Sequence, residues 1–422
     1  MRTEILVRVL ITSGILLLLD LYVYKGIRVL TSGMAASLWR NVIHTGYWTI
    51  SIGLIVWMAY SFVTYRSAPM EKVDYRMFFF LFGITLTVVV PKLLFGLFHL
   101  VEDIVHLVRW VAERSSEAVP NGGSPITRID FLTKIGAVLA VLPFSAFIYG
   151  MVKGRFNFRV IRKTLAYQNL PAAFDGLKVV QLSDMHLGSF FENRDAVQPA
   201  IKMINDLEPD VILFTGDLVN NYAQEAEPWV DVFKGLKASV GKFSVLGNHD
   251  YGDYVAWSDV QSKINNLDRV KQANRDMGFQ LLLNESVVLE RNGDKIGIAG
   301  VENWGLPPFP QHGDLKKALS GIQDIPFQVL MSHDPSHWDA QVLKKSKVDL
   351  TLSGHTHGMQ FGVEIGGFQW SPVKFKYPRW AGLYEEGRQH LYVNRGFGYI
   401  GYPGRVGISP EITLLELRSE MG

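Results

Sequence analysis

The chain has 422 residues, 48% of them hydrophobic, with a formal net charge of +2 and no cysteine. Nucleic-acid-binding domains carry a clear basic excess, so we expect no nucleic-acid partner. A chain without cysteine can form neither disulfides nor thiolate metal sites, and any metal must therefore be held by nitrogen and oxygen ligands. The length allows two to three domains.

The first third of the chain is strongly apolar. Four segments are each about long enough to cross a bilayer as a helix, and they lie at about residues 5–24, 42–65, 77–100 and 131–152. Pro91 and Lys92 interrupt the third segment, and its apolar pattern continues to about Val111, so five crossings are the alternative. We predict an all-α transmembrane region of about four helices over residues 1–152, and hence a multi-pass membrane protein in contact with the lipid bilayer.

Two features near the third segment call for interpretation. The spacing of His99, Glu102 and His106 places them on one helix face, where the end of the segment favours a solvated or interfacial position over a metal site. The stretch SSEAVPNGGSP at residues 115–125 is typical of a loop.

After a basic linker at residues 153–164, the hydrophobic pattern of the sequence changes. Eight short apolar runs rich in Val, Ile and Leu follow, as expected of buried strands. The runs are LKVVQLSD, PDVILFTGD, KFSVLGNHD, KIGIAGVEN, FQVLMSHD, VDLTLSGHTH, QHLYVN and ITLLEL. Seven of the eight end in Asp, Asn or His, and residues that follow strands often line a functional cleft. We therefore predict a layered α/β domain over residues 165–422.

The polar residues at these strand ends have the chemistry of metal ligands. In GHTHG, the two histidines are two residues apart, so on an extended segment both rings point to the same side. The candidate ligands in chain order are Asp184, His186, Asp217, Asn248, His333, His355 and His357. Mixed imidazole, amide and carboxylate ligands suit divalent first-row metals such as Mn, Fe or Zn.

The ordered blocks DMH, GD, GNH, H and GHTH resemble those of the calcineurin-like metallophosphoesterases over roughly residues 175–417. The resemblance implies a four-layer β-sandwich flanked by helices, with two divalent metal ions. One metal would be bound by Asp184, His186, Asp217 and His357. The second would be bound by Asp217, Asn248, His333 and His355, with Asp217 as the bridge.

Such a pair of metals predicts hydrolysis of a phosphate ester. The two ions would generate a bridging hydroxide and neutralise charge on the phosphoryl oxygens. His249, next to Asn248, is the candidate general acid or oxyanion stabiliser, because a histidine can donate a proton near neutral pH. Asn248 and His249 are thus the predicted catalytic residues.

The substrate class is less directly encoded. The block GDLVNNY lacks the DRG of phosphoprotein phosphatases, which disfavours a protein substrate. Membrane spans followed by a phosphoesterase are similar to membrane-bound bacterial phosphodiesterases and to UDP-2,3-diacylglucosamine hydrolases. We expect a lipid-linked phosphodiester or pyrophosphate, such as a UDP-diacylglucosamine-type molecule. The alternatives are a phosphodiesterase on soluble nucleotides and a non-catalytic membrane binding protein, which the complete ligand set disfavours.

Two later stretches bear on substrate binding. Residues 366–384 interleave aromatic and cationic side chains, which suits either a membrane interface or an excursion packed on the domain. Residues 394–407 are rich in glycine and tyrosine and are interpreted as a loop lining the cleft. Arg395 and Arg405 in this loop are candidate phosphate contacts.

Two patterns oppose each other on the side of the membrane that holds the catalytic domain. The basic residues at 153–163 favour the cytoplasm. TRIDFLTK at residues 127–134 resembles a twin-arginine export signal, although Ile129 stands where the second arginine belongs. We favour the extracytoplasmic side of a bacterial cytoplasmic membrane. Oligomeric state cannot be inferred from the sequence.

Overall fold

The structure, a computed structural model, describes residues 2–34, 38–67, 75–115, 126–191 and 193–420. It divides into two compact units, Met1–Tyr149 and Gly150–Gly422, called the helical unit and the sheet unit below. The predicted loop at 115–125 lies, apart from Ser115, outside the described residues.

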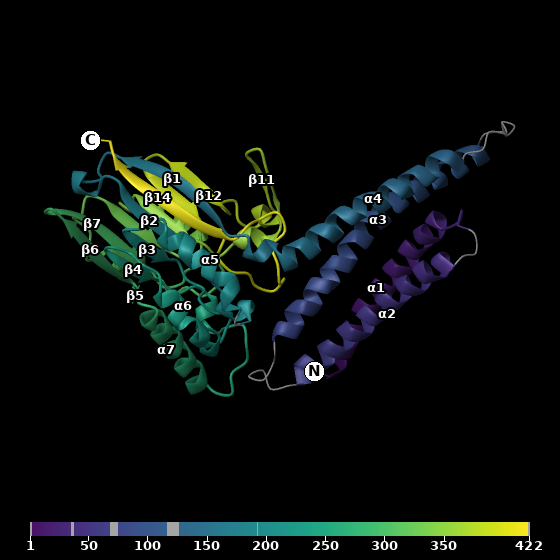
Figure 1. Ribbon diagram of the computed structural model, residues 1–422, viewed down its shortest axis with the longest axis horizontal. Helices are drawn as coiled ribbons and strands as arrows, with labels where there is room; N and C mark the ends of the chain where they lie inside the picture. Colours follow the sequence, from purple (N-terminus) through teal and green to yellow (C-terminus); the bar gives the residue numbers. More distant parts are fainter. Residues whose placement is uncertain (1, 35–37, 68–74, 116–125, 192, 421–422) are drawn as a thin grey trace. The chain divides into compact units, whose positions relative to one another are not determined.

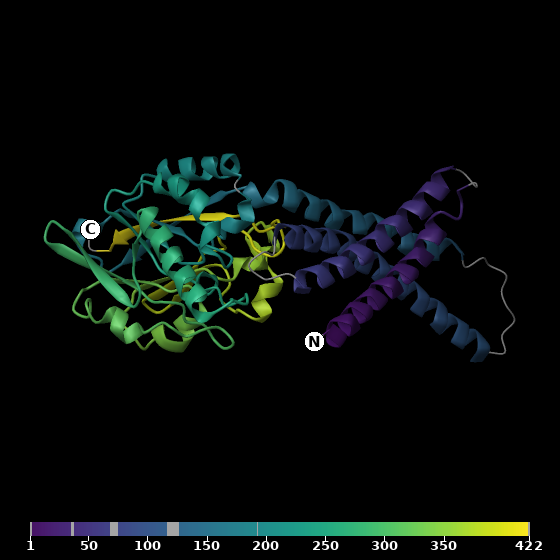
Figure 2. The same ribbon diagram turned by 90° about the horizontal axis from the view of Figure 1, so that it is seen from below.

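The helical unit is built from long apolar helices (Figures 1 and 2). They are α1 (Arg2–Leu30), α2 (Leu38–Ser67), α3 (Tyr75–Ser115) and α4 (Ile126–Val152), whose last residues belong to the sheet unit. Among the described residues, four helices are long and apolar enough to cross a membrane, which confirms the four predicted helices. The five-crossing alternative is wrong, because α3 continues as one helix through Pro91. Proline removes a single backbone N–H, and the apolar sequence continues on both sides of it.

Two charged residues inside these helices, Lys92 and Asp20, form an ion pair. Lys92 Nζ lies 2.5 Å from Asp20 Oδ1 and 2.7 Å from Ser51 Oγ. The Tyr47 hydroxyl donates to the same Asp20 oxygen at 3.0 Å. Because an unpaired charge in hydrocarbon is costly, this pairing explains how two ionisable side chains fit within predicted spans.

The solvated or interfacial position predicted for His99 and Glu102 is wrong, and that of His106 stays a prediction. His99 and Glu102 are buried, with 2% and 4% of their surface exposed, and His106 is exposed. Thr133 of α4 donates a hydrogen bond to Glu102. Helical spacing alone could not show this, because the burial comes from neighbouring helices: α4 at Glu102, and α1, whose Tyr22 ring centroid lies 5.3 Å from that of His99.

The sheet unit contains two six-stranded sheets. The first has the order β1 (Arg159–Tyr167), β14 (Glu411–Ser419), β2 (Leu177–Leu182), β3 (Val211–Phe214), β4 (Gly241–Ser244) and β5 (Gln280–Leu281). The second has the order β12 (Gly382–Glu386), β13 (Gln389–Val393), β9 (Leu350–Ser353), β8 (Gln328–Met331), β7 (Asp294–Gly300) and β6 (Glu285–Arg291). All eight predicted apolar runs form strands. The central strands β2, β3 and β4 pair in parallel, as do β7, β8, β9 and β13.

The two sheets pack face to face, and helices cover their outer faces. Side chains of both sheets, such as Val179, Leu213, Val329 and Leu352, share one buried core. The first sheet is covered by α5 (Arg194–Asn205), α6 (Val230–Lys234) and α7 (Val260–Asp276) (Figure 1). The second is covered by α8 (Leu315–Leu319) and the π-helix η8 (Trp338–Val342). The four-layer sandwich flanked by helices is therefore confirmed.

Part of the predicted basic linker is a strand. Residues 159–163 form the first half of β1, which pairs in parallel with β14. The sequence of this segment does not have the apolar pattern of a buried strand, because β1 is an edge strand whose Arg159, Arg162 and Lys163 are exposed.

Short elements complete the unit. A separate two-stranded hairpin is formed by β10 (Val363–Ile365) and β11 (Phe368–Trp370). The single-turn helices are η2 (Gly154–Phe156), η3 (Ala172–Phe174), η4 (Leu187–Phe190), η5 (Ala223–Glu225), η6 (Glu227–Trp229), η7 (His249–Tyr251), η9 (His357–Gln360) and η10 (Pro372–Phe375).

Candidate metal centre

The predicted ligands follow the carboxyl ends of five central strands. Asp184 and His186 follow β2, Asp217 follows β3 and Asn248 follows β4. The second sheet contributes His333 after β8, and His355 and His357 after β9. All seven side chains come together in two adjoining groups, at one edge of the sandwich.

Tight backbone turns bring these side chains together. Asp184, His186, Asp217, His355 and His357 all have positive φ, between 45° and 69°. Such a conformation is strained for a residue with a side chain, by about 1–3 kcal/mol each, and strained residues cluster at functional sites. The rest of the fold must therefore compensate for this strain.

Glycines make the turns possible by removing side-chain volume. A Cβ at Gly247 would lie 2.2 Å from Asp217 Oδ1, and one at Gly354 would lie 2.3 Å from Asp184 Oδ2. Gly216 has a φ of 96°, and its Cβ would lie 2.4 Å from the Gly247 nitrogen. These close approaches explain why a glycine directly precedes each of the ligands Asp217, Asn248 and His355.

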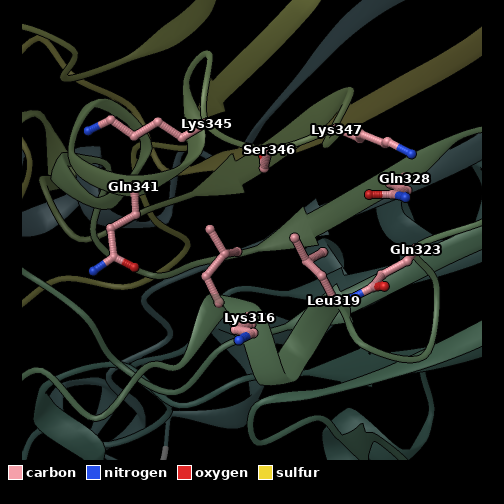
Figure 3. A pocket seen from close by; sticks show the side chains of 9 residues that line it. Lys316, Leu319, Gln323, Gln328, Gln341, Lys345, Ser346 and Lys347 are labelled. Carbon is pink, nitrogen blue, oxygen red and sulfur yellow. The ribbon is translucent and has the colours of Figure 1, made fainter.

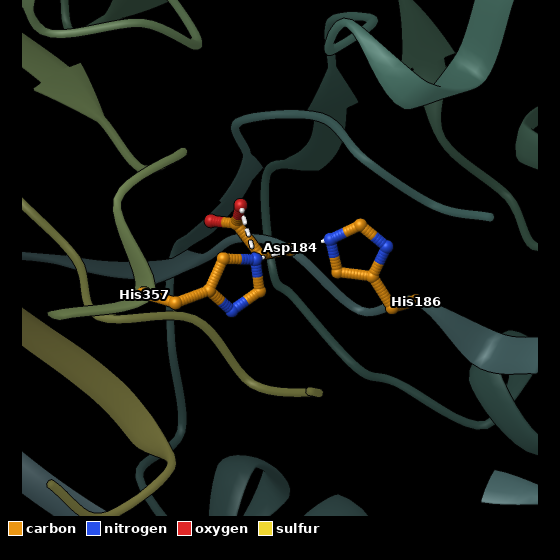
Figure 4. A group of neighbouring side chains, drawn as sticks. All are labelled: Asp184, His186 and His357. Atoms are coloured by element: carbon orange, nitrogen blue, oxygen red, sulfur yellow. Dashed lines mark hydrogen bonds and ion pairs between the residues drawn. The ribbon is translucent and has the colours of Figure 1, made fainter. Parts of the chain in front are cut away.

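The first group consists of Asp184, His186 and His357, whose ligand atoms lie within 4.8 Å of one another (Figure 4). His357 Nε2 is 3.1 Å from Asp184 Oδ1 and 3.1 Å from His186 Nε2. The two rings are tilted by 30° with centroids 4.9 Å apart. Two imidazole nitrogens and a carboxylate oxygen therefore face one small volume.

The second group consists of Asp217, His333 and His355, again within 4.8 Å, with Asn248 beside them. Asn248 Oδ1 lies 3.1 Å from His333 Nε2 and 2.8 Å from His355 Nδ1. The Nδ1 atom of His333 lies 2.8 Å from the Thr215 carbonyl oxygen, which accepts its proton. This hydrogen bond leaves Nε2 as the nitrogen that can bind a metal.

Asp217 connects the groups. Its Oδ2 lies 3.5 Å from His186 Nε2 in the first group and 3.2 Å from His333 Nε2 in the second. Its Oδ1 accepts a hydrogen bond of 2.8 Å from the His249 backbone N–H. The carboxylate therefore occupies the position expected of a bridge between two cations.

The chemistry of the donor set fits divalent cations. Burial lowers the pKa of His186, and it lowers the pKa of His355 to about 4, so both rings are neutral and have a lone pair to donate. Burial also acts to lower the pKa of His333, but the charges of Asp217 and Asp184 raise it to about 10. In the metal-free protein that proton compensates the buried carboxylates, and a bound cation would take over this role.

His249 lies beside the centre. Its Nδ1 is 2.7 Å from the Asn220 carbonyl oxygen, and its ring centroid is 5.0 Å from that of His186. The carbonyl accepts the Nδ1 proton, which leaves Nε2 for a substrate. Burial lowers the pKa of His249, so the free ring is neutral, and an anionic phosphoryl group beside it would favour the protonated form.

Two carboxylates that the spacing of the ligands did not reveal support the metal centre. Asp250 is fully buried and accepts backbone N–H groups of Asp217 and Gly247, both at 2.9 Å, through Oδ2. Burial, followed by the charge of Asp217, raises the pKa of Asp250 to about 7. Asp334 Oδ2 lies 3.5 Å from His355 Nε2. Each directly follows a ligand block, in GNHD and SHD, and that adjacency is the signal that could have identified them.

Tyr377 was also missed. Its hydroxyl lies 2.8 Å from His355 Nε2 and 3.4 Å from Asp334 Oδ2. The contact orients the His355 ring so that Nδ1 faces the second group. Tyr377 is distant in sequence from every ligand block, so no spacing rule indicates it.

Arg395 and Arg405 are both buried and engaged by the protein. Arg395 Nε pairs with Glu411 at 2.5 Å, and its Nη1 pairs with Glu364. Arg405 Nη2 donates to the carbonyl oxygens of Arg395 at 2.9 Å and Gly396 at 3.0 Å, and lies 3.4 Å from His357 Nδ1. The Arg405 guanidinium thus holds the glycine-rich loop beside the first group. Contact of either arginine with substrate phosphate stays a prediction.

A separate hollow of about 430 Å³ lies at the opposite ends of β8 and β9 (Figure 3). Leucine, glutamine and lysine side chains line it, namely Leu315, Lys316, Leu319, Gln323, Gln328, Gln341, Lys345 and Lys347, together with Ser346. None of the seven predicted ligands, all of which the structure describes, is among its lining residues. It is therefore distinct from the metal centre.

Comparisons with known proteins agree with this geometry. The family model described as "Calcineurin-like phosphoesterase" matches residues 177–359, and "Probable Calcineurin-like phosphoesterase, transmembrane domain" matches residues 4–155. The uncharacterized metallophosphoesterase YkuE of Bacillus subtilis is 34% identical over 61% of this chain and 84% of its own length. The phosphodiesterase YaeI of Escherichia coli is 28% identical over 69% of this chain and 99% of its own length. The UDP-2,3-diacylglucosamine pyrophosphatase LpxG of Chlamydia trachomatis is 30% identical over 57% of this chain and 84% of its own length.

Proposed function

This chain belongs to the calcineurin-like metallophosphoesterase family, and we propose that it cleaves a lipid-linked phosphodiester or pyrophosphate. It is a membrane protein that hydrolyses phosphoric esters with metal ions. In this proposal the two groups of ligands each hold one divalent ion. The observation that supports two ions is the position of Asp217 Oδ2, which lies within 3.5 Å of a ligand nitrogen in each group.

The residues divide the work as follows. Asp184, His186 and His357 would hold one ion, Asn248, His333 and His355 would hold the other, and Asp217 would serve both. Bound Mn, Fe or Zn ions supply an activated water and neutralise charge on the phosphoryl oxygens.

Protein groups around the ions orient the reaction. Through Nε2, His249 donates a proton to the leaving oxygen or to a charged phosphoryl oxygen. The Asn220 carbonyl fixes its ring through the 2.7 Å contact with Nδ1. Asp250 holds the turns that carry Asp217 and Asn248. Arg405 keeps the loop at residues 395–398 against His357.

The lipid-linked substrate is supported by two observations. The chain has membrane-spanning helices ahead of the catalytic unit, and tethering raises the local concentration of a membrane-borne substrate. The similar protein LpxG is named for a pyrophosphatase activity on UDP-2,3-diacylglucosamine, which is a nucleotide-linked lipid.

A substrate screen with the full-length chain in lipid vesicles tests the proposal. The panel contains UDP-diacylglucosamine, phospholipids, cyclic nucleotides and bis-p-nitrophenyl phosphate, each with and without added Mn. We expect metal-dependent turnover that is highest for a lipid-linked phosphodiester or pyrophosphate. Higher turnover of soluble cyclic nucleotides would instead favour the nucleotide phosphodiesterase. Asp217→Asn provides the inactive control.

A further inference from the structure

The β10–β11 hairpin has one apolar face. Its register pairs Val363 with Trp370 and Ile365 with Phe368. Directly opposed residues of an antiparallel pair share a face, and so do residues two apart on one strand. These four apolar side chains therefore lie together, whereas Glu364 and Gln369 occupy the other face.

Three of the four side chains on this face are exposed, and Trp370 is half-buried. Val363, Ile365 and Phe368 are 40%, 74% and 61% exposed. Gly366 and Gly367, both with positive φ, close the hairpin with a turn of two residues. In Figure 1 the hairpin carrying β11 stands apart from both sheets of this unit. The surfaces of soluble proteins rarely expose several large apolar side chains together, so these side chains at the tip of the hairpin indicate a binding partner.

The neighbouring turn extends this surface with an aromatic ring and cations. Phe375, the last residue of η10, is 81% exposed. Lys374 Nζ lies 5.7 Å from the centre of the Phe375 ring. Lys376 is exposed too, with its Nζ 4.8 Å from the centre of the Phe309 ring. Apolar tips flanked by lysines are the composition that settles at the surface of an anionic bilayer.

The base of the hairpin is fixed to the part of this unit where the last span ends. The Gly362 N–H donates to the Val406 carbonyl at 2.9 Å, and the Arg405 N–H donates to the carbonyl of Gly150, in the last turn of α4, at 3.2 Å. Glu364 on the polar face pairs with Arg395. A strand of three residues rises only about 10 Å. The tip is thus within short reach of Val152, the last residue of α4.

The same segment is joined to the metal centre. The hairpin begins shortly after His357, and the hydroxyl of Tyr377, two residues after Phe375, lies 2.8 Å from His355 Nε2. The Phe309 ring packs edge-on against His355 with centroids 4.7 Å apart. Whatever binds the exposed apolar surface is therefore held beside the ligands.

We propose that the apolar face of the β10–β11 hairpin, together with Phe375, inserts into the headgroup region of the lipid bilayer and holds the metal ligands beside membrane-borne phosphoesters. This inference rests on the proposed lipid-linked substrate and adds a second membrane contact besides the spans. A stable protein interface uses roughly 20–30 residues a side. The few exposed side chains here are too few for that, but a few apolar and aromatic residues suffice for interfacial insertion.

The chain contains no cysteine, so single labels can be placed without removing native thiols. We label Phe368→Cys with a fluorophore in the full-length protein in vesicles that contain anionic lipid. Val288→Cys is the matched control, because Val288 is a 41% exposed apolar residue on the edge strand β6. Phe375→Cys gives a second position outside the hairpin.

The labels at 368 and 375 are expected to be quenched by lipid-borne nitroxide and shielded from aqueous iodide, whereas the label at 288 shows the reverse. Iodide access at 368 equal to that at 288 overturns the proposal. Shielding from iodide without quenching by lipid also overturns it, because the occupant would then be a second copy or another protein.

Activity separates this inference from the function on which it rests. Each large side chain removed from the bilayer costs about tenfold in partitioning. In Ile365→Ser/Phe368→Ser the ratio of lipid-substrate turnover to bis-p-nitrophenyl phosphate turnover is expected to fall at least tenfold, and Val288→Ser leaves it unchanged. An unchanged ratio in the double variant contradicts the inference. If the wild type hydrolyses no lipid-linked ester while the labels still report insertion, the proposed substrate has failed and the membrane contact stands.

Discussion

Replacement of Asp250 tests whether buried backbone hydrogen bonds hold the metal-binding turns. Its Oδ2 accepts from the Asp217 and Gly247 N–H groups, both at 2.9 Å. Its Oδ1 accepts from Leu218 N–H at 2.8 Å and from Val219 N–H at 3.3 Å. Asp250→Ala leaves these donors buried without an acceptor.

The expected loss of stability follows from this count. An unsatisfied buried donor costs about 1–3 kcal/mol. Asp250→Ala also removes the cost of burying the carboxylate, which offsets part of this loss. We therefore count only the three short hydrogen bonds, each at the lower limit of about 1 kcal/mol, which gives about 3 kcal/mol for Asp250→Ala. Asp250→Asn retains one acceptor oxygen and is expected to lose about 2 kcal/mol. For domains of roughly 150–250 residues, 1 kcal/mol shifts Tm by about 2–4 °C, so Asp250→Ala should melt about 6–12 °C lower.

Thermal unfolding of the metal-free full-length protein in detergent measures this shift, and a Mn titration measures the accompanying loss of affinity. Partners that orient metal ligands are typically worth about 10–100-fold in affinity. Asp253→Ala is the control, because Asp253 makes only a partly exposed ion pair with Lys263, which contributes about 0–1 kcal/mol. The reasoning is refuted if Asp250→Ala melts with the wild type and binds Mn equally well.

Three further predictions follow from the same structure. His249→Asn should slow hydrolysis of alkyl diesters by about 10²–10⁴-fold and that of p-nitrophenyl diesters much less, with metal content unchanged; equal losses on both would contradict proton donation. Burial lowers the pKa of His337 to about 4, so between about pH 6.5 and 4 the unfolded chain binds a proton that the folded chain does not. This difference at His337 should lower stability by about 2 kcal/mol from pH 7 to 5, so chemical unfolding of His337→Asn should show a fall that is smaller by that amount. Protease added to intact spheroplasts should digest the sheet unit if it lies outside the cytoplasm, whereas protection until lysis would place it inside.

Sequence patterns predicted the buried strands and the ligands that follow them, because parallel strands covered on both faces read as short apolar runs. They failed for the edge strand β1, whose exposed Arg159 and Lys163 resemble a linker. They also missed Tyr377, which reaches His355 only through tertiary folding. Asp250 follows a ligand block, but its role depends on backbone N–H groups from two separate turns, which no residue pattern encodes. The hairpin at residues 363–370 was visible only as an aromatic stretch, since its single apolar face depends on the strand register.

The central claim is that seven side chains hold two metal ions joined by Asp217. The most direct test is the number of Mn ions bound per chain when the metal-free full-length protein is titrated and analysed for metal content. Two ions per wild-type chain and at most one per Asp217→Asn chain are expected. A wild-type chain that binds a single ion, or an Asp217→Asn chain that still binds two, would contradict the account.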